Sequence, residues 1–415
     1  MQNAKNRTNI KFLLFMCWLV YSSSYLGKVN FSASKLSLMT HFAVNEAEIG
    51  LVGTFFFFAY GIFMVINGVF CKKYNIKYVI FTALVVSSVI NLSIPFIPKS
   101  AFGVIKFLWM INGAVLSMLW PTLIRLLSET LPKDKMPTAS KVMGTTVATG
   151  TLLIYGLSAL FAEIKAFQFS FFVPAIIVPT VAVLWLLFYK RFTDIDSEDE
   201  PLPLTETTDK KAKTKLPSGI LTVIVCFALF AVVTNLVKDG MTGWVPKILK
   251  DSYGLPDSVS ILMTLALPLM GIIANFFTVW IAGKMKNLVL LDGIFFVVGG
   301  VMVLGITLLL STNLVVLTFI MMMVVSLIAS GSNNIITSIF PLSMKGKGNS
   351  GLIAGVLNGF CYLGSTISDY GLGAIKVATG NWLSVFYVLL GGCGIVVLTA
   401  AIYSVINGLK KNKVE

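Results

Sequence analysis

Residues 218–247 read SGILTVIVCFALFAVVTNLVKDGMTGWVPK, and this stretch decides the class of fold. A helix needs about 20 consecutive apolar residues to cross a bilayer, and the run that begins at Ser218 supplies them. The predicted span, 218–240, carries Lys238 near its far end. A charge inside a membrane segment costs at least about 2.5 kcal/mol, so Lys238 is a candidate for function.

The first apolar segment carries a second lysine. Its end reads Tyr21-Ser-Ser-Ser-Tyr25-Leu-Gly-Lys28-Val-Asn-Phe31, and Lys28 precedes Lys238 by 238 − 28 = 210 positions, about half of the 415-residue chain. We expect the two amines to face each other across a central cavity and to hold an anion. The alternative is that either lysine snorkels to the outer interface of the membrane.

Composition narrows the class of protein. The chain is 56% hydrophobic and 12% charged, whereas soluble proteins carry about 25% charged residues. A polytopic all-α membrane protein is therefore predicted. Its net charge of +14 is spread over loops in a way that fits lipid topology, so no nucleic-acid partner is expected.

Motifs for catalysis or metal binding are not found in the sequence. The five cysteines have no ligand-like spacing, so we expect neither a disulfide framework nor a metal site. A phosphate-binding GxxxxGK[ST] loop is missing, which argues against ATP as a direct energy source. We predict no cofactor and no enzymatic activity, since no pair of nucleophile and base is found.

Apolar runs predict twelve spans in two six-helix bundles. The bundles cover residues 1–189 and 218–415, and a charged cytoplasmic linker covers 190–217. The predicted spans are 11–30, 49–70, 77–97, 104–127, 138–162, 168–189, 218–240, 258–281, 288–310, 313–335, 349–374 and 382–407. In span eleven, Gly351, Gly355 and Gly359 recur every four residues and are interpreted as a site of close helix packing.

Lysine and arginine distribution predicts the topology. They gather on the side that holds both termini and the linker, and positive residues stay in the cytoplasm. We expect a monomeric multi-pass protein in the lipid bilayer of the plasma or inner membrane, with both termini cytoplasmic. Twelve spans in two halves suggest the major facilitator architecture, in which substrate binds between the halves near the midplane.

Polar residues accompany both lysines at helical spacing. Tyr21, Tyr25 and Lys28 share one helix face, and Asn235 lies one turn before Lys238. An ammonium group offers three donors and no acceptor, which suits a phosphate or a carboxylate.

Other charged residues lie in or near the predicted spans. Arg125 either supports the binding site or anchors the end of span four. Asp239 adjoins Lys238 and is expected to tune or neutralise it. Asp369 either pairs with Lys238 or carries a proton. Asp292, near the cytoplasmic end of span nine, is interpreted as structural.

The chain resembles the organophosphate:phosphate antiporters, the major facilitator family of glycerol-3-phosphate and hexose-phosphate transporters. Tyr25-Leu-Gly-Lys28-Val-Asn-Phe31 is similar to that family's first-helix Tyr-Leu-x-Arg-Lys-Asn-Phe. Three further similarities are Trp120-Pro-x-x-x-Arg125, Lys238-Asp-Gly-x-x-x-Trp244-x-Pro246 and Tyr362-Leu-Gly364.

The resemblance implies roles for particular residues. The two arginines that clamp phosphate in the family fall on Lys28 and Lys238, so both charges are kept and both guanidinium forks are lost. The fifth-helix histidine of the family falls near Thr146, and Tyr362 takes the place of the span-eleven tyrosine. The family's loop motif between spans two and three is degraded, because Lys72 replaces its acid.

The predicted function is secondary active transport of a small organic anion. A phosphorylated metabolite exchanged for inorganic phosphate by alternating access is favoured. The first alternative is a proton- or sodium-coupled symporter of organic or sugar-acid anions that uses Asp369 or Asp239. The second is a phosphate-ester sensor that does not transport.

Overall fold

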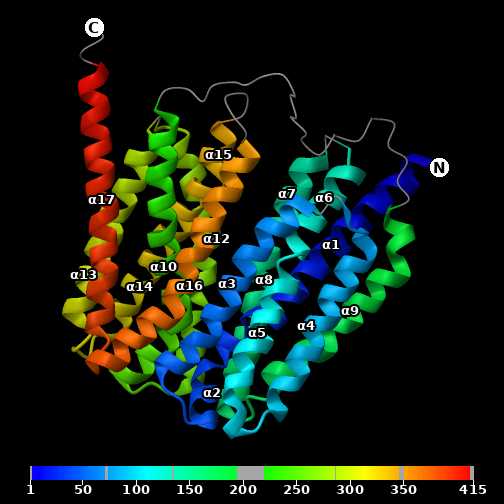
Figure 1. Ribbon diagram of the computed structural model, residues 1–415, viewed down its shortest axis with the longest axis horizontal. Helices are drawn as coiled ribbons and strands as arrows, with labels where there is room; N and C mark the ends of the chain where they lie inside the picture. Colours follow the sequence, from blue (N-terminus) through cyan, green and yellow to red (C-terminus); the bar gives the residue numbers. More distant parts are fainter. Residues whose placement is uncertain are drawn as a thin grey trace. The chain divides into compact units, whose positions relative to one another are not determined.

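The computed structural model describes residues 2–70, 73–132, 135–193, 219–285, 287–344 and 350–411. Within these ranges every regular element is a helix and none is a strand (Figure 1). The predicted linker lies outside the described residues from 194 onward. The helices in these ranges confirm the expectation of an all-α membrane protein.

The chain divides into two compact units. The N-terminal unit holds Met1–Ala43 and Phe58–Ala212, and the C-terminal unit holds Val44–Phe57 and Lys213–Glu415. Helix α3 (Glu46–Phe70) thus contributes its first half to the C-terminal unit and its second half to the N-terminal unit.

The N-terminal unit is built around α1. This helix packs against α8 and α9, and α4 packs against α9 and α5. Trp109, Phe171 and Trp185 are among the large side chains fully buried in its core. Beside α3, its helices are α1 (Gln2–Ala33), α2 (Lys35–Phe42), α4 (Ile76–Ser93), α5 (Phe102–Leu116), α6 (Leu119–Thr130), α7 (Met136–Gly144), α8 (Thr146–Glu163) and α9 (Phe169–Thr193).

The C-terminal unit is built around α10. This helix packs most extensively against α16, and the other large contacts are α13 with α17 and α12 with α14. Phe227, Phe230 and Trp244 fill its core. Its helices are α10 (Ile220–Tyr253), α11 (Asp257–Thr264), α12 (Ala266–Ala282), α13 (Leu288–Leu309), α14 (Val315–Asn334), α15 (Phe340–Ser343), α16 (Ser350–Thr379) and α17 (Leu383–Lys411), with a π-helical turn at Ile335–Ile339.

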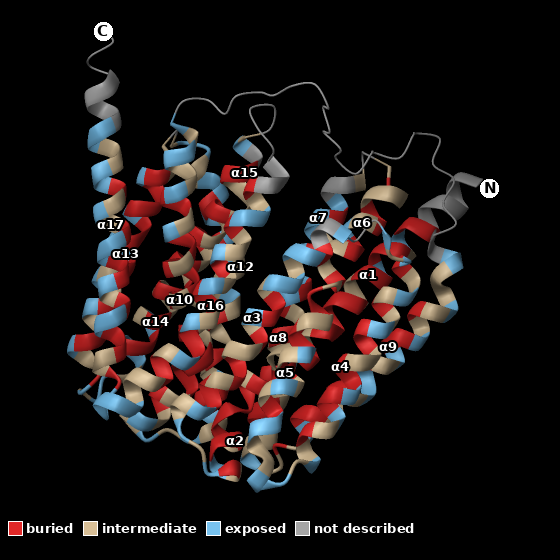
Figure 2. Ribbon diagram, viewed as in Figure 1, coloured by how far each residue is buried: buried red, intermediate tan, exposed pale blue. Residues whose placement is uncertain are grey.

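Eleven helical segments of the described chain are long and apolar enough to cross a membrane. They match eleven of the twelve predicted spans; the remaining predicted span is α16, which has 30 residues. Asn358, Ser365, Ser368 and Asp369 make α16 more polar than the others. Large apolar side chains such as Leu187, Phe276 and Val316 are exposed, as expected for a surface that lipid covers. Figure 2 shows exposed residues along helices such as α17.

Prolines explain three interruptions of the spans. A proline has no N–H to donate to the carbonyl four residues before it, so the helix loosens there. Pro121 follows the break between α5 and α6 at Ser117, and Pro268 follows the break at Leu265. Pro341 follows the π-helical turn at Ile335–Ile339.

Glycines allow α10 and α16 to approach closely, but they are not the predicted ones. A Cβ atom on Gly364 would overlap the carbonyl oxygen of Val232, and one on Gly240 would lie 2.6 Å from Leu372. Gly355 and Gly359 have open space within 4 Å of their Cβ positions in the described structure. The predicted packing role is therefore wrong for these two glycines, because the helices cross further along α16.

Candidate functional site

In the N-terminal unit, Lys28 lies against two tyrosine rings. Its Nζ is 3.9 Å from the ring centre of Tyr60 on α3 and 4.9 Å from that of Tyr25. The face of an aromatic ring attracts a cation, and desolvation strengthens that attraction. Tyr60 is only 2% exposed, so the ammonium group points toward the interior of this unit. This arrangement favours a binding role over snorkelling.

Tyr21 and Tyr25 extend the cluster along α1. Their ring centres lie 5.5 Å apart, and the ring of Tyr21 lies 4.8 Å from that of Trp120 on α6. Helix α8 approaches α1 closely at this level, because a Cβ on Gly150 would lie 2.6 Å from the Cβ of Tyr25. The motif residues Tyr25, Lys28 and Trp120 therefore gather in one region of the N-terminal unit.

Thr146 is fully buried at the start of α8, where its hydroxyl donates to the carbonyl of Met143 at 2.5 Å. Arg125 donates to Glu129 at 2.7 Å and to the backbone carbonyl of Tyr74 at 3.0 Å. Tyr74 lies in the connection between α3 and α4. These bonds favour the anchoring alternative for Arg125.

In the C-terminal unit, Lys238 lies within α10 and not near its end. We predicted that this span ends near residue 240, but α10 continues through Pro246 to Tyr253. The extension carries one local ion pair, between Lys247 and Asp251, and two contacts with distant residues that local sequence does not reveal. Lys247 pairs with Glu46 at 3.3 Å and with Asp251 at 2.6 Å, and Asp251 accepts from Trp382 at 2.9 Å.

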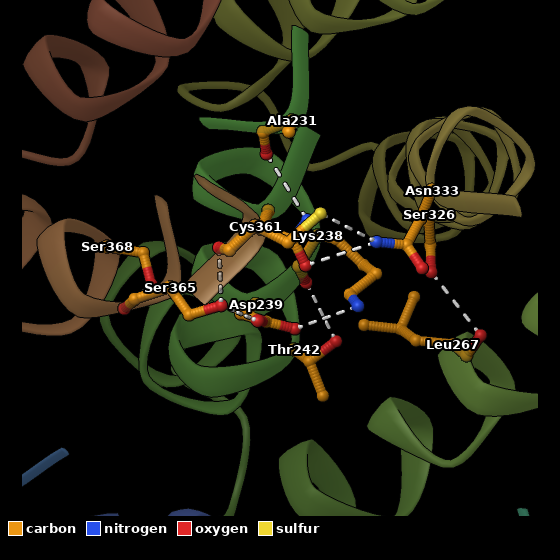
Figure 3. Close-up of polar contacts among 11 residues, drawn as sticks. Ala231, Lys238, Asp239, Thr242, Leu267, Ser326, Asn333, Cys361, Ser365 and Ser368 are labelled. Carbon is orange, nitrogen blue, oxygen red and sulfur yellow. Dashed lines mark hydrogen bonds and ion pairs between the residues drawn. The ribbon is translucent and has the colours of Figure 1, made fainter. Parts of the chain in front are cut away.

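Lys238 forms an ion pair with the next residue. Its Nζ lies 3.5 Å from Oδ1 of Asp239, and the two side chains are 28% and 22% exposed (Figure 3). The other carboxylate oxygen of Asp239 accepts a short hydrogen bond from Ser365 on α16. Asp239 therefore neutralises Lys238 in part, as one of the alternatives predicted, while both groups stay accessible to a small solute.

Asn235 joins this cluster one helical turn before Lys238. Its side-chain amide oxygen accepts from the side-chain amide of Asn333 on α14 at 3.4 Å. The same Asn333 nitrogen lies 3.6 Å from the sulfur of Cys361 (Figure 3). Asn333 lies two residues before the π-helical turn at Ile335–Ile339, a distortion that is frequent at functional sites.

Three residues of these clusters were not among the predicted site residues: Tyr60, Asn333 and Ser365. Tyr60 and Asn333 are polar side chains inside predicted spans, and that is a signal that could have been followed. Ser365 lies three residues after Tyr362 and directly follows the Tyr362-Leu-Gly364 motif. Tyr362 itself is half-buried on α16, and its carbonyl accepts from Thr366 at 2.7 Å.

Asp369 lies at the contact of α16 with the first half of α3, both in the C-terminal unit. It is 4% exposed, and a Cβ on Gly53 would overlap its carboxylate. The hydroxyl of Thr54 donates to the carbonyl of Thr366 at 2.8 Å. The ion pair of Lys238 is with Asp239, so this geometry favours a packing position for Asp369 over pairing with Lys238, the first of the two predicted alternatives. The second, a proton-carrying role, stays a prediction.

The four described cysteines, Cys17, Cys226, Cys361 and Cys393, are buried and not in disulfides. Cys71 and Lys72 lie outside the described residues. Groups of three or more metal-ligating side chains are not found in the part of the chain that the structure describes.

Bilayer-length helices in two units, with charged side chains in their interiors, define a polytopic membrane transporter. The profile of the Major Facilitator Superfamily matches residues 17–368. The chain therefore belongs to the major facilitator superfamily. A solved structure of similar fold is a bacterial homologue of the human lysosomal transporter Spinster, inward-facing and unoccupied, with a TM-score of 0.76 and 12% identity, over 95% of this chain and 96% of that one.

Similar curated proteins include carriers of sugar phosphates and sugar acids. A probable hexose phosphate transport protein of Chlamydia pneumoniae is 24% identical over 171 residues, 41% of this chain and 36% of that protein. The membrane sensor protein UhpC of Escherichia coli is 24% identical over 126 residues, 30% of this chain and 28% of the sensor. The hexuronate transporter of Bacillus subtilis is 23% identical over 264 residues, 62% of this chain and 60% of the transporter.

The first two matches support the resemblance to the organophosphate:phosphate antiporters. This chain covers 36% of the Chlamydia relative and 28% of the sensor, so the likeness concerns only part of each protein.

Proposed function

We propose that the protein is a secondary transporter of a small organic anion, and that the favoured solute is a phosphorylated metabolite exchanged for inorganic phosphate. It would act as a monomer in the plasma or inner membrane with both termini in the cytoplasm. The observation that carries the proposal is the position of Lys238. It lies within a 34-residue helix, partly exposed, among Asp239, Asn235 and Ser365.

Lys28 is proposed as a second anion-binding cation, in the N-terminal unit. Like Lys238 it lies in the first helix of its half, and its ammonium group lies on the interior tyrosines of its unit. A phosphate dianion can take donors from two ammonium groups, whereas a neutral sugar cannot balance their charge. The similarity to a hexose phosphate transport protein supports this solute class.

The ion pair between Asp239 and Lys238 affects how readily the empty carrier can change orientation. Without a solute, Lys238 is partly neutralised by Asp239, and the Ser365 hydroxyl holds that carboxylate. An arriving anion competes with Asp239 for the ammonium group. Because Asp239 neutralises Lys238 only in part, some positive charge remains inside the empty carrier, and a carrier would change orientation more readily with an anion bound than without one. This favours exchange over uniport.

The test uses purified protein in proteoliposomes loaded with inorganic phosphate. Uptake of labelled glucose 6-phosphate or glycerol 3-phosphate is expected, and phosphate-free vesicles should take up far less. Lys28→Ala and Lys238→Ala should each lower phosphate binding and uptake strongly. Lys141→Ala is the matched control, since Lys141 is exposed on α7 and should leave both unchanged. Retained binding in both site variants would refute the two-lysine site.

Symport of a sugar acid is the second candidate. The hexuronate transporter match, which covers 62% of this chain, favours it. In this case glucuronate uptake would follow an imposed pH or sodium gradient and would not need internal phosphate. Asp369→Asn or Asp239→Asn would abolish the effect of the gradient if that carboxylate carried the coupling ion.

A sensor is the third candidate, favoured by the similarity to UhpC. Such a protein would bind a sugar phosphate and show no flux under any gradient. Measuring binding and uptake on the same preparation separates this outcome from both kinds of transport.

A further inference from the structure

Asp292 is a fully buried carboxyl group that the proposed transport site does not use. It lies in the first half of α13 with 0% of its surface exposed. Neither carboxyl oxygen has a partner with hydrogen-bond geometry among the described residues. An ionised carboxylate that is buried without a partner in a membrane-spanning helix costs about 2.5 kcal/mol or more. The neutral acid is therefore favoured.

Asp292 adjoins a ladder of polar side chains between α10 and α14. The Ser332 hydroxyl is near the Asp292 carboxyl, without hydrogen-bond geometry to it, and it lies 2.7 Å from the hydroxyl of Thr234. The next contact along these helices is the hydrogen bond that the Asn333 side chain donates to the side-chain oxygen of Asn235, at 3.4 Å. Lys238 follows one helical turn after Asn235. The ladder therefore leads from the buried acid to the ion pair of the proposed anion site.

Ionisable groups around Asp292 come from few elements. Helix α14, which packs against α13, carries no charged residue, and the Thr278 hydroxyl of α12 is buried without a partner in the described structure. On α17, which also packs against α13, the ionisable side chains within the apolar segment include Cys393 and Tyr403. On α16, Cys361 is within electrostatic reach of Lys238, Asp239 and Asp292. Cys361 is thus a neighbour that Asp292 shares with the charges of the proposed site.

We propose that Asp292 is a proton-binding site linked to anion binding at Lys238, so that the carrier holds an anion and a proton together. A negative charge that arrives at Lys238 disfavours a second negative charge on Asp292, which therefore keeps or takes up a proton from water. Linkage is reciprocal, so the protonated acid strengthens anion binding. The linkage rests on the proposed function, whereas the proton site itself does not.

Infrared spectroscopy tests the proton site without any solute. Purified wild-type protein at neutral pH should show the C=O stretching band of a buried protonated carboxyl group. Asp292→Asn should remove that band, and Asp292→Glu should shift it. Asp257→Asn is the control, since Asp257 is a partly exposed acid paired with Lys250 at 2.7 Å. A spectrum without the band, or a band that survives in Asp292→Asn, would overturn the proton site.

Phosphate binding at several pH values tests the linkage. One linked proton makes phosphate affinity rise by up to about tenfold per pH unit of acidification. Phosphate itself also takes up protons, but this affects its binding to wild type and to Asp292→Asn equally. The difference between the two pH profiles therefore reports on Asp292. Equal pH dependence in the two proteins would overturn the linkage. Failure of the wild type to bind phosphate would instead refute the proposed function and the linkage, while the infrared result would still decide the proton site.

Discussion

The ammonium group of Lys238 has its counter-ion beside it on α10, and a serine of α16 holds that counter-ion in place. Both charged side chains are partly exposed, so solvent screens the pair and its net contribution is modest. An anion that binds here must displace part of the interaction between Lys238 and Asp239. Asp239 therefore lowers the affinity of the site for an anion. It also lowers the energetic cost of the Lys238 charge when the site is empty.

Asp239→Asn should strengthen binding of inorganic phosphate. Removing the competing charge frees the ammonium group, and an exposed pair of this kind is worth up to about 1 kcal/mol, or about fivefold in affinity. Isothermal titration calorimetry on purified protein measures the change. Asn235→Ala serves as the comparison, because it removes a polar group from the same helix face without changing the charge. Weaker binding in Asp239→Asn would show that the carboxylate supports the anion site.

His41 is the single histidine, so its titration can be followed without assignment. Partial burial lowers its pKa from 6.5, and the positive charge of Lys99 lowers it further. We expect NMR to give a value below 6.5, and Lys99→Ala to move it part of the way back. A value at or above 6.5 in the wild type would contradict this prediction.

The same shift gives the sign of a pH effect on stability. Since the folded pKa lies below the unfolded one, the contribution of His41 is fully present above pH 6.5. It is lost as the pH falls through the folded pKa. His41→Gln should remove this part of the pH dependence of the melting temperature.

At the scale of elements, the first half of α3 packs against α16 with little room to spare. A Cβ on Gly50 would overlap the backbone carbonyl of Asp369, and one on Gly373 would overlap the carbonyl of Glu46. Backbone atoms cannot rotate away as a side chain can. Small residues at such positions let two helices approach closely in a membrane.

Gly50→Ala should destabilise the C-terminal unit by forcing these helices apart. Overpacking of this kind costs about 1–3 kcal/mol, so the melting temperature in detergent should fall by several degrees. Gly156→Ala on α8 is the matched control, since open space surrounds that glycine in the described structure. Alanine favours helices over glycine, so the control should melt at the same or a higher temperature. Equal melting temperatures for the two variants would contradict the packing.

Helix ends illustrate what local sequence can and cannot predict. Span nine was predicted at 288–310, and α13 is Leu288–Leu309. Span seven was predicted to end at 240, yet α10 runs to Tyr253 because Lys247 and Asp251 are paired with distant residues. Apolar length sets where a span can lie, and tertiary ion pairs decide how far its helix continues.

At the scale of the whole molecule, the distribution of positive charge sets the proposed orientation. Both termini and the linker are expected in the cytoplasm, where lysine and arginine are retained during insertion. A green fluorescent protein fused after Glu415 should fluoresce in a bacterial host, and alkaline phosphatase at the same position should be inactive. The reverse result would invert the topology and place the wrong ends of the helices toward the cytoplasm.

The sequence by itself determined the membrane class, the position of almost every span and the two lysines as candidates, because hydrophobic length and buried charge are local properties. It also supplied the family resemblance through short motifs around Lys28, Trp120 and Lys238. Only the tertiary structure decided that Tyr60 covers Lys28, that Ser365 holds Asp239, and that Asn333 reaches Asn235. These contacts join residues far apart in the chain. The spans hold many other polar side chains, and only the packing of the helices decides which of them meet.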